Sequence, residues 1–229
     1  MAHRRLQRAA LEAVAGHFAA TLQMAKGPGD ARLTLAGKRI TLVVTAVETR
    51  AARRARIAKP GLRFDRVALG LIARLQTALH DAVPDHDTVL VTITAPIRLP
   101  AKTAAAMTEK IRSLVATRAA PARLTDRIHG NDIQAHLLKG GTARTSRLVG
   151  FVHNPDSDPA ILVAVTRSLL ARVDSRQRAA GSRWLVVAGQ DASVPLETYR
   201  RVWAQLGLRT VFEKTLVVVA GGRIATLSA

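Results

Sequence analysis

The sequence predicts an α/β fold built on a mainly parallel sheet, with helices on its faces and antiparallel hairpins at the chain ends. Two observations support this prediction. From about residue 62, stretches with apolar residues at helical spacing alternate with short apolar runs of strand length, as in helices packed on a sheet. Near each end of the chain, two strand-like runs flank a glycine-containing turn, which is typical of β-hairpins.

The composition limits the kind of molecule. The chain has 229 residues, of which 48% are hydrophobic and 3% aromatic, and it has no cysteine. A chain of this length can bury a sizeable core, here one built from aliphatic side chains. Disulfides, thiol catalysis and cysteine metal sites are excluded. No apolar run approaches the ~18 residues that a membrane helix needs, so we expect a cytoplasmic protein that does not contact a membrane.

We expect residues 1–229 to form a single domain, in which a helix and a hairpin (1–49) precede a basic linker (50–61) and an α/β core (62–229). An apolar side chain recurs at every fourth position in the first 25 residues, which predicts an amphipathic helix. These side chains are Leu6, Ala10, Val14, Phe18 and Leu22. The two predicted hairpins turn at Gly37 and at Gly221-Gly222.

In the core, the same spacing rules give the order of elements. Asp65 is a typical N-cap for the first core helix, and Gly207 a typical residue just beyond the end of the last one. The predicted core strands cover residues 88–95, 148–152 and 183–188. Glycine and proline punctuate residues 117–146, which we expect to form a long irregular connection with a short helix at 132–138.

The polar loop after the strand at 148–152 is the main candidate for a catalytic site. His153, Asp156 and Asp158 lie in this loop, directly before a helix that Pro159 opens. In an α/β sheet, a strand–loop–helix unit places a site at the carboxyl end of the strand. His153 could act as a general base. The same residues also suit a turn and, at Asp158, a helix N-cap.

Two further loops are expected at the same edge of the sheet. Arg98 follows the strand at 88–95, and Asp191 follows the strand at 183–188. Asp156, Asp158 and Asp191 could together bind Mg²⁺ or Mn²⁺, because both ions prefer oxygen ligands. These loops would then serve a metal-dependent enzyme that cleaves phosphodiesters or processes phosphates.

Two other patterns could hold a metal. Asp30 and Glu48 flank the first hairpin, with Arg50 two residues further on. This arrangement resembles that of metal-dependent PD-(D/E)xK nucleases, although arginine stands where that motif has lysine and a glycine separates Pro28 from Asp30. His129, Asp132 and His136 would be the second set of metal ligands, if residues 132–136 are helical.

The charge favours a different class of function. The formal net charge is +19 and the pI is about 11.8, which favours polyanionic partners. A GC-rich coding sequence would by itself enrich arginine and alanine, so composition alone does not identify the partner. The residues expected to contact phosphates are the basic segment and two later arginines: Arg50, Arg53, Arg54, Arg56, Lys59, Arg144 and Arg147.

Three hypotheses follow. The first is a protein that binds nucleic acid or another polyanion through arginine–phosphate contacts, largely independent of sequence and with no required cofactor. The second is the metal-dependent enzyme with Mg²⁺ or Mn²⁺. The third is a non-catalytic subunit of a larger assembly. The sequence does not decide whether the protein is an enzyme.

Overall fold

The computed structural model describes residues 2–24, 30–47, 62–117, 122–139, 145–156, 159–173, 182–189, 194–207 and 212–228. These residues form five helices and two mixed sheets. The helices are α1 (Ala2–His17), α2 (Arg66–Leu79), α3 (Pro100–Ala116), α4 (Ala160–Val173) and α5 (Leu196–Leu206). No helix in the described part of the chain is long and apolar enough to cross a membrane.

Sheet A joins the two ends of the chain. Its strands, in spatial order, are β1 (Thr21–Met24), β2 (Asp30–Leu35), β3 (Lys38–Val47), β9 (Ser182–Gly189), β10 (Lys214–Val219) and β11 (Arg223–Ser228). The expected division at 50–61 therefore does not coincide with the sheets, because β9, β10 and β11 return from the expected core to extend the N-terminal hairpin.

Sheet B is built from the middle of the chain. Its strands, in spatial order, are β4 (Leu62–Arg63), β8 (Leu148–His153), β5 (Asp87–Thr94), β7 (Asn131–Lys139) and β6 (Arg123–Ile128). The expectation of one mainly parallel sheet is wrong. Only β3–β9, β9–β10 and β5–β8 are parallel among the described pairs, while the other six pairs are antiparallel.

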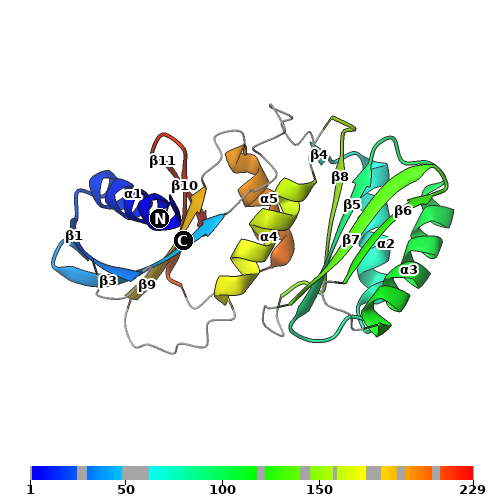
Figure 1. Cartoon of the computed structure of the whole chain (residues 1–229), viewed down its shortest axis with the longest axis horizontal. Coiled ribbons are helices and arrows are strands. Elements are labelled where there is room, and N and C mark those ends of the chain that lie inside the picture. The colour runs from blue at the N-terminus through cyan, green and yellow to red at the C-terminus, as the bar shows by residue number, and fades with distance from the viewer. Residues whose placement is uncertain are drawn as a thin grey trace.

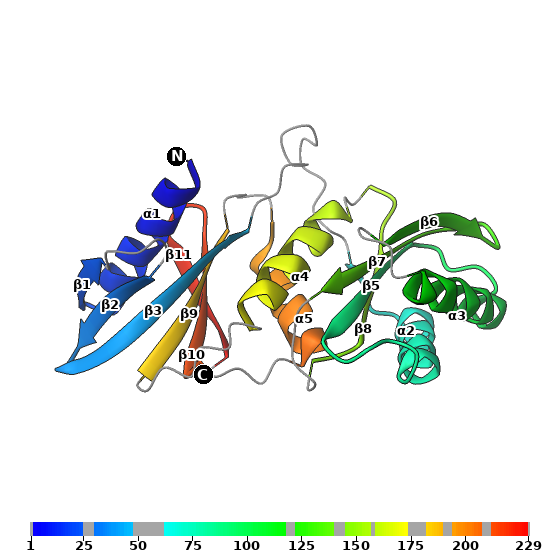
Figure 2. The ribbon, with the colours of Figure 1, turned by 60° about the horizontal axis from the view of Figure 1, so that its bottom comes forward.

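The elements stack in five layers (Figures 1 and 2). Helix α1 covers the outer face of sheet A, α4 and α5 lie between the sheets, and α2 and α3 cover the outer face of sheet B. The alternation of side chains along each strand produces this arrangement. On β5, for example, Val89 and Val91 pack with α2 and α3, whereas Leu90 packs with the middle helices. We call the faces that turn toward α4 and α5 the inner faces.

Several local predictions are confirmed. Both terminal hairpins form. The Asp65 carboxylate accepts a hydrogen bond of 2.9 Å from the backbone N–H of Ala68 at the start of α2. That bond is the main cause that lowers the pKa of Asp65. Gly207 ends α5 in the left-handed conformation, with φ of 60°.

The prediction for residues 117–146 is wrong. A hairpin of β6 and β7 replaces the irregular connection, and the expected helix at 132–138 is part of β7. Ile133 and Ala135 pack outward on the cluster with α3, whereas Gln134 and His136 point to the inner face. This two-residue period is that of a strand. His129 and Gly130 form the turn, with φ of 49° and 79°. The common two-residue turns of β-hairpins require such positive φ values.

Candidate anion-binding site on the inner face of sheet B

The inner face of sheet B changes from apolar to polar toward its β6–β7 edge. The strand registers set its side chains in rows. One row runs Arg123, His136, Leu90 and Val149, and the next runs Thr125, Gln134, Thr92 and Phe151. A third row contains the pairs Arg127–Asp132 and Thr94–His153. Leu90, Val149 and Phe151 belong to the core beneath α4 and α5, so the polar side chains lie beyond that core.

A half-buried histidine lies at the centre of the first row. His136 on β7 is paired across the sheet with Arg123 on β6, and Arg167 of α4 also acts on it electrostatically. Burial lowers the pKa of His136 below 6.5, and the positive charges of Arg123 and Arg167 lower it further. The buried Nε2 atom of His136 has no hydrogen-bond partner among the described residues.

Arg123 and Arg167 have no carboxylate partner among the described residues. Arg123 donates a hydrogen bond of 3.2 Å from Nε to the Thr125 hydroxyl. Neither Arg123 nor Arg167 forms an ion pair within the described part of the chain, whereas Arg127 nearby lies 3.6 Å from the Asp132 carboxylate. Arg123, His136 and Arg167, which we call the basic cluster, therefore concentrate positive charge at a place where a histidine side chain has an unused nitrogen.

A bound anion would offset the positive charge of Arg123 and Arg167. Two guanidinium groups can donate several parallel hydrogen bonds to phosphate oxygens. A negative charge there would also favour the protonated form of His136, which could then donate from both ring nitrogens. The arrangement therefore suits a phosphate better than a metal ion, since the two guanidinium groups repel cations.

A polar pocket of about 310 Å³ lies next to the basic cluster. Most of its lining comes from the second and third rows, and the pair Asp126–Ile133 lies between these rows. The lining residues are Thr92, Thr94, Thr125, Asp126, Arg127, Asp132, Ile133, Gln134 and His153. Thr125, Arg127 and Asp132 are exposed, so the pocket opens to solvent. At its base, the Thr92 side chain is 1% exposed, and its hydroxyl has no hydrogen-bond partner among the described residues.

His153, predicted as a general base, lines this pocket and is 4% exposed. Its Nδ1 lies 2.9 Å from the carbonyl oxygen of Asn154. Because a carbonyl oxygen can only accept, Nδ1 carries the hydrogen in this bond, and in a neutral imidazole Nε2 is then the acceptor. His153 can thus offer an acceptor, but no described carboxylate is bonded to it to form a catalytic pair.

The strands that precede the three loops of the enzyme hypothesis belong to two different sheets. Arg98 and His153 follow neighbouring strands of sheet B, whereas the loop after residue 188 follows a strand of sheet A. The Arg98 backbone is held by the Asn131 side chain, with bonds of 2.7 and 3.0 Å. Asp156 lies exposed in a turn, and Asp158 and Asp191 lie outside the described residues.

The other metal patterns fare differently. Asp132 and His136 share a face of β7, but as strand residues they are four positions apart, which separates them by about 13 Å instead of one helical turn. Asp30 is paired with Val43, five residues before Glu48, and both Glu48 and Arg50 lie outside the described residues. No group of three His, Asp or Glu side chains in the described ranges is close enough to hold a metal.

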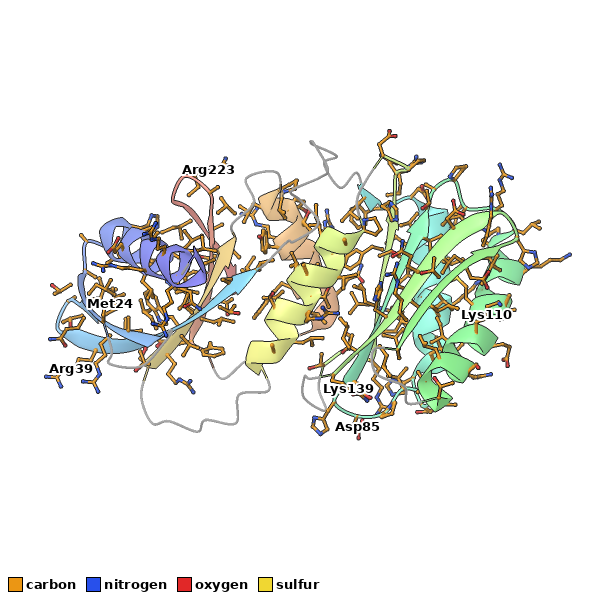
Figure 3. The ribbon with its side chains drawn as sticks, in the orientation of Figure 1. Met24, Arg39, Asp85, Lys110, Lys139 and Arg223 are labelled. Carbon is orange, nitrogen blue, oxygen red and sulfur yellow. The ribbon has the colours of Figure 1, made fainter. Side chains whose placement is uncertain are left out.

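Of the residues predicted to contact phosphate, the structure describes Arg147 alone. Its guanidinium donates to the carbonyl oxygens of His80 (2.6 Å) and Val83 (3.3 Å) and pairs with Asp85 at 2.6 Å. Arg147 thus joins β8 to the turn between α2 and β5, at the end of sheet B where Figure 3 labels Asp85 and Lys139. Residues 50, 53, 54, 56, 59 and 144 lie outside the described residues.

The sequence prediction missed Arg123, Thr92, Gln134 and Arg167 as site residues. The alternation of polar and apolar residues in 123–139 would have placed Arg123 and Gln134 on one face of a hairpin. Nothing local marks Arg167, which reaches the site through the packing of α4 against β7. Comparisons with protein-family models, curated proteins and solved structures find no match for this chain.

Proposed function

We propose that this protein binds nucleic acid through arginine–phosphate contacts, largely independent of sequence. The observation that carries the proposal is the basic cluster, in which Arg123 and Arg167 flank His136 without a described carboxylate partner. The net charge of +19 supplies the long-range attraction for a polyanion. Guanidinium groups stay charged at all ordinary pH values, so the contact does not depend on a metal or cofactor.

A second pair of arginines lies on sheet A, apart from the basic cluster. Arg32 on β2 and Arg39 on β3 share the inner face of sheet A with Thr34 and Thr41, because Arg32 is paired with Thr41 and Thr34 with Arg39. Both arginines are exposed, and neither has an ion-pair partner within the described ranges. Nucleic acid presents phosphates at regular intervals, so a spread of unpaired arginines suits it better than a single small anion.

The test measures how binding depends on salt. Each phosphate neutralised on duplex DNA adds about 0.9 to the slope of log K against log salt. We expect the double variant Arg123→Ala/Arg167→Ala to lower that slope by up to about two units. The control is Arg4→Ala/Arg5→Ala, which removes the same charge from exposed positions of α1, on the outer face of sheet A. It should change the slope much less.

Titrations should use two unrelated duplexes and one RNA. Similar changes on all three are expected, since phosphate contacts carry no base information. Replacing Arg53, Arg54 and Arg56 together with Ala tests the basic linker in the same assay, where a decrease of up to about three units is expected. Wild-type protein that binds none of these ligands at low salt would rule out the proposal. If the cluster and control variants lower the salt slope equally, the phosphate contacts must lie at other residues.

A second candidate function is that of a subunit in a larger assembly, which an exposed apolar surface favours. Val67 and Leu99 are 48% and 55% exposed, near the N-terminal ends of α2 and α3. A pocket of about 450 Å³ lies between these helix ends, with Val67, Arg66 and Arg74 in its lining. Phe64 and Leu69, which are 37% and 52% exposed, line a separate pocket on another face of α2. Exposed apolar patches often mark protein interfaces.

The apolar surface predicts a partner protein with an apolar segment and acidic flanks. A photo-crosslinker placed at position 67 should capture one such partner in cells, and Leu99→Glu should abolish the capture. A crosslinker at position 12 on α1 is the control. Equal capture from both positions would argue against a specific interface on α2.

A further inference from the structure

The polar pocket beside the basic cluster is built to hold more than a phosphate. Its row, Thr125–Gln134–Thr92, lies two residues along the strands from the row of Arg123 and His136. Two strand residues span about 7 Å, which is comparable to the reach of a nucleobase from the phosphate of its own nucleotide. A nucleotide whose phosphate lies on the basic cluster can therefore place its base in the pocket.

The chemistry of the pocket matches a neutral polar group. The Gln134 amide offers donors and an acceptor, and Thr92 and Thr94 offer hydroxyls that do both. Both acidic side chains of the lining have basic partners, since Asp132 lies 3.6 Å from Arg127 and Asp126 lies 2.7 Å from Lys110. Nucleobase edges carry donors and acceptors side by side, and an amide such as that of Gln can bond to two of them at once.

The buried Thr92 hydroxyl gives an independent reason to expect a ligand. Buried polar atoms in proteins nearly always have hydrogen-bond partners, yet this hydroxyl has none among the described residues. It lies at the base of a pocket that opens to solvent. A ligand with a polar edge that enters the pocket would supply the missing bond.

The size of the pocket decides between unpaired and paired nucleic acid. A volume of about 310 Å³ is at the lower end of small-molecule pockets and accepts one base but not a base pair. A base in a duplex would first have to unpair and leave the stack, which costs free energy. Single strands and strand ends carry bases that are already free.

We infer that the pocket of Thr92, Thr94, Gln134 and His153 binds one unpaired nucleobase, while Arg123, His136 and Arg167 hold the adjoining phosphate. The inference rests on the proposed function and names its ligand as single-stranded nucleic acid. It adds a base contact to the charge-based contacts, so that affinity depends on the presence of a base.

The experiment compares a fluorescently labelled oligoadenylate with a strand of the same length that lacks bases. Both carry the same phosphates, so charge-based binding is equal. We expect wild-type protein to bind the base-containing strand about tenfold more tightly, as one good bidentate contact is worth about 1–3 kcal/mol. Thr92→Val, which replaces the hydroxyl with a methyl group, and Gln134→Leu should bind the abasic strand like wild type and lose most of the preference.

The outcomes separate the two proposals. Failure to bind either strand at low salt overturns the proposed function and this inference with it. Equal binding of both strands by wild type overturns the inference alone, as does a full preference in both pocket variants. Thermal unfolding of each variant confirms that it is folded. If Thr92→Val does not fold, Gln134→Leu, which alters a half-buried residue at the pocket wall, decides the outcome.

Discussion

Basic side chains have different surroundings at the β9–β10 end of sheet A and at the β6–β7 edge of sheet B. At the β9–β10 end of sheet A, Lys38 pairs with Glu213 at 3.0 Å, and Arg183 lies over the Phe212 ring at 5.3 Å. Lys214 lies over the rings of Trp184 and Phe18, at 4.8 and 5.2 Å. At the β6–β7 edge of sheet B, by contrast, Arg123 and Arg167 have no counter-ion in the described ranges, and both depress the pKa of a neighbouring histidine.

This difference separates cations that hold the fold from cations that are available to a ligand. Lys38 is a cation of the first kind, because it pairs with the Glu213 carboxylate. Hydrogen bonds from Ser182 and then from Lys38 lower the pKa of Glu213. A net charge of +19 counts both kinds equally. The surroundings of each arginine therefore say more about binding than the total charge does.

The largest effect is expected at Arg183, on the structural side of the comparison. Its side chain is 5% exposed and lies against an aromatic ring. Arg183→Ala should lower the free energy of unfolding by about 2 kcal/mol or more, since desolvated cation–π contacts and packed arginine stems both stabilise. Arg123→Ala is the matched control and should change stability by only about 0.5 kcal/mol, as exposed substitutions usually do.

Denaturant unfolding measures both variants, and the salt dependence of binding is recorded alongside. Arg183→Ala should leave the salt slope unchanged where it is folded, whereas Arg123→Ala should lower it by about one unit. A stable Arg183→Ala with weakened binding would contradict the division between structural and available cations.

Arg147 is expected to behave as a structural cation, with a smaller effect. Two backbone carbonyl oxygens and the Asp85 carboxylate accept its hydrogen bonds, and its side chain is 26% exposed. Arg147→Ala should lower the free energy of unfolding by about 1.5 kcal/mol, at the lower end of the range for hydrogen bonds to charged groups. Its effect on the salt slope of nucleic-acid binding should be negligible. A slope reduced by about one unit would restore Arg147 as a phosphate contact.

Arg147 also shows why part of the site could not be predicted. Composition and local density identified basic residues, and the alternating elements identified an α/β protein with terminal hairpins. Which arginines find partners depends on contacts between distant segments, such as Arg147 with the turn after α2. The sequence patterns of single strands do not show which strands pair, so the division into two sheets could not be predicted from them. In the structure, α4 and α5 pack on the inner faces of both sheets.

The hairpin at 123–139 could have been predicted from the sequence, but its pattern is weak. Gly130 and the preceding histidine adopt positive φ values, and a His-Gly pair is a weaker turn signal than Asn-Gly or Asp-Gly. The polar residues that make the site, among them Gln134 and His136, also weaken the hydrophobic alternation. A site on the exposed edge of an inner face thus obscures the pattern that would identify its strand.

The smallest effect is expected in the pH dependence of the free energy of unfolding, through His136. Burial, with Arg123 on β6 and Arg167 on α4, holds its pKa below 6.5 in the folded protein. The unfolded chain then binds a proton that the folded protein does not bind. The free energy of unfolding therefore falls as the pH drops from 6.5 through the folded-state pKa. His136→Gln lacks this proton and should lose less stability on acidification. Unfolding at about pH 7.5 and about pH 5.5, on either side of the ordinary histidine pKa, measures the difference between the two proteins.

Nucleic acid should oppose this effect. A phosphate between Arg123 and Arg167 offsets their charge and raises the pKa of His136, so binding takes up a proton and affinity increases as the pH falls below 6.5. Asp132 on the same face lies near Arg127, and the chain has seven histidines, so the informative quantity is the pH dependence of wild type minus that of His136→Gln. Wild type and variant with parallel affinity profiles would place the phosphate away from His136. A variant that loses the acid-side gain, while Arg4→Ala/Arg5→Ala keeps it, would place the phosphate between Arg123 and Arg167.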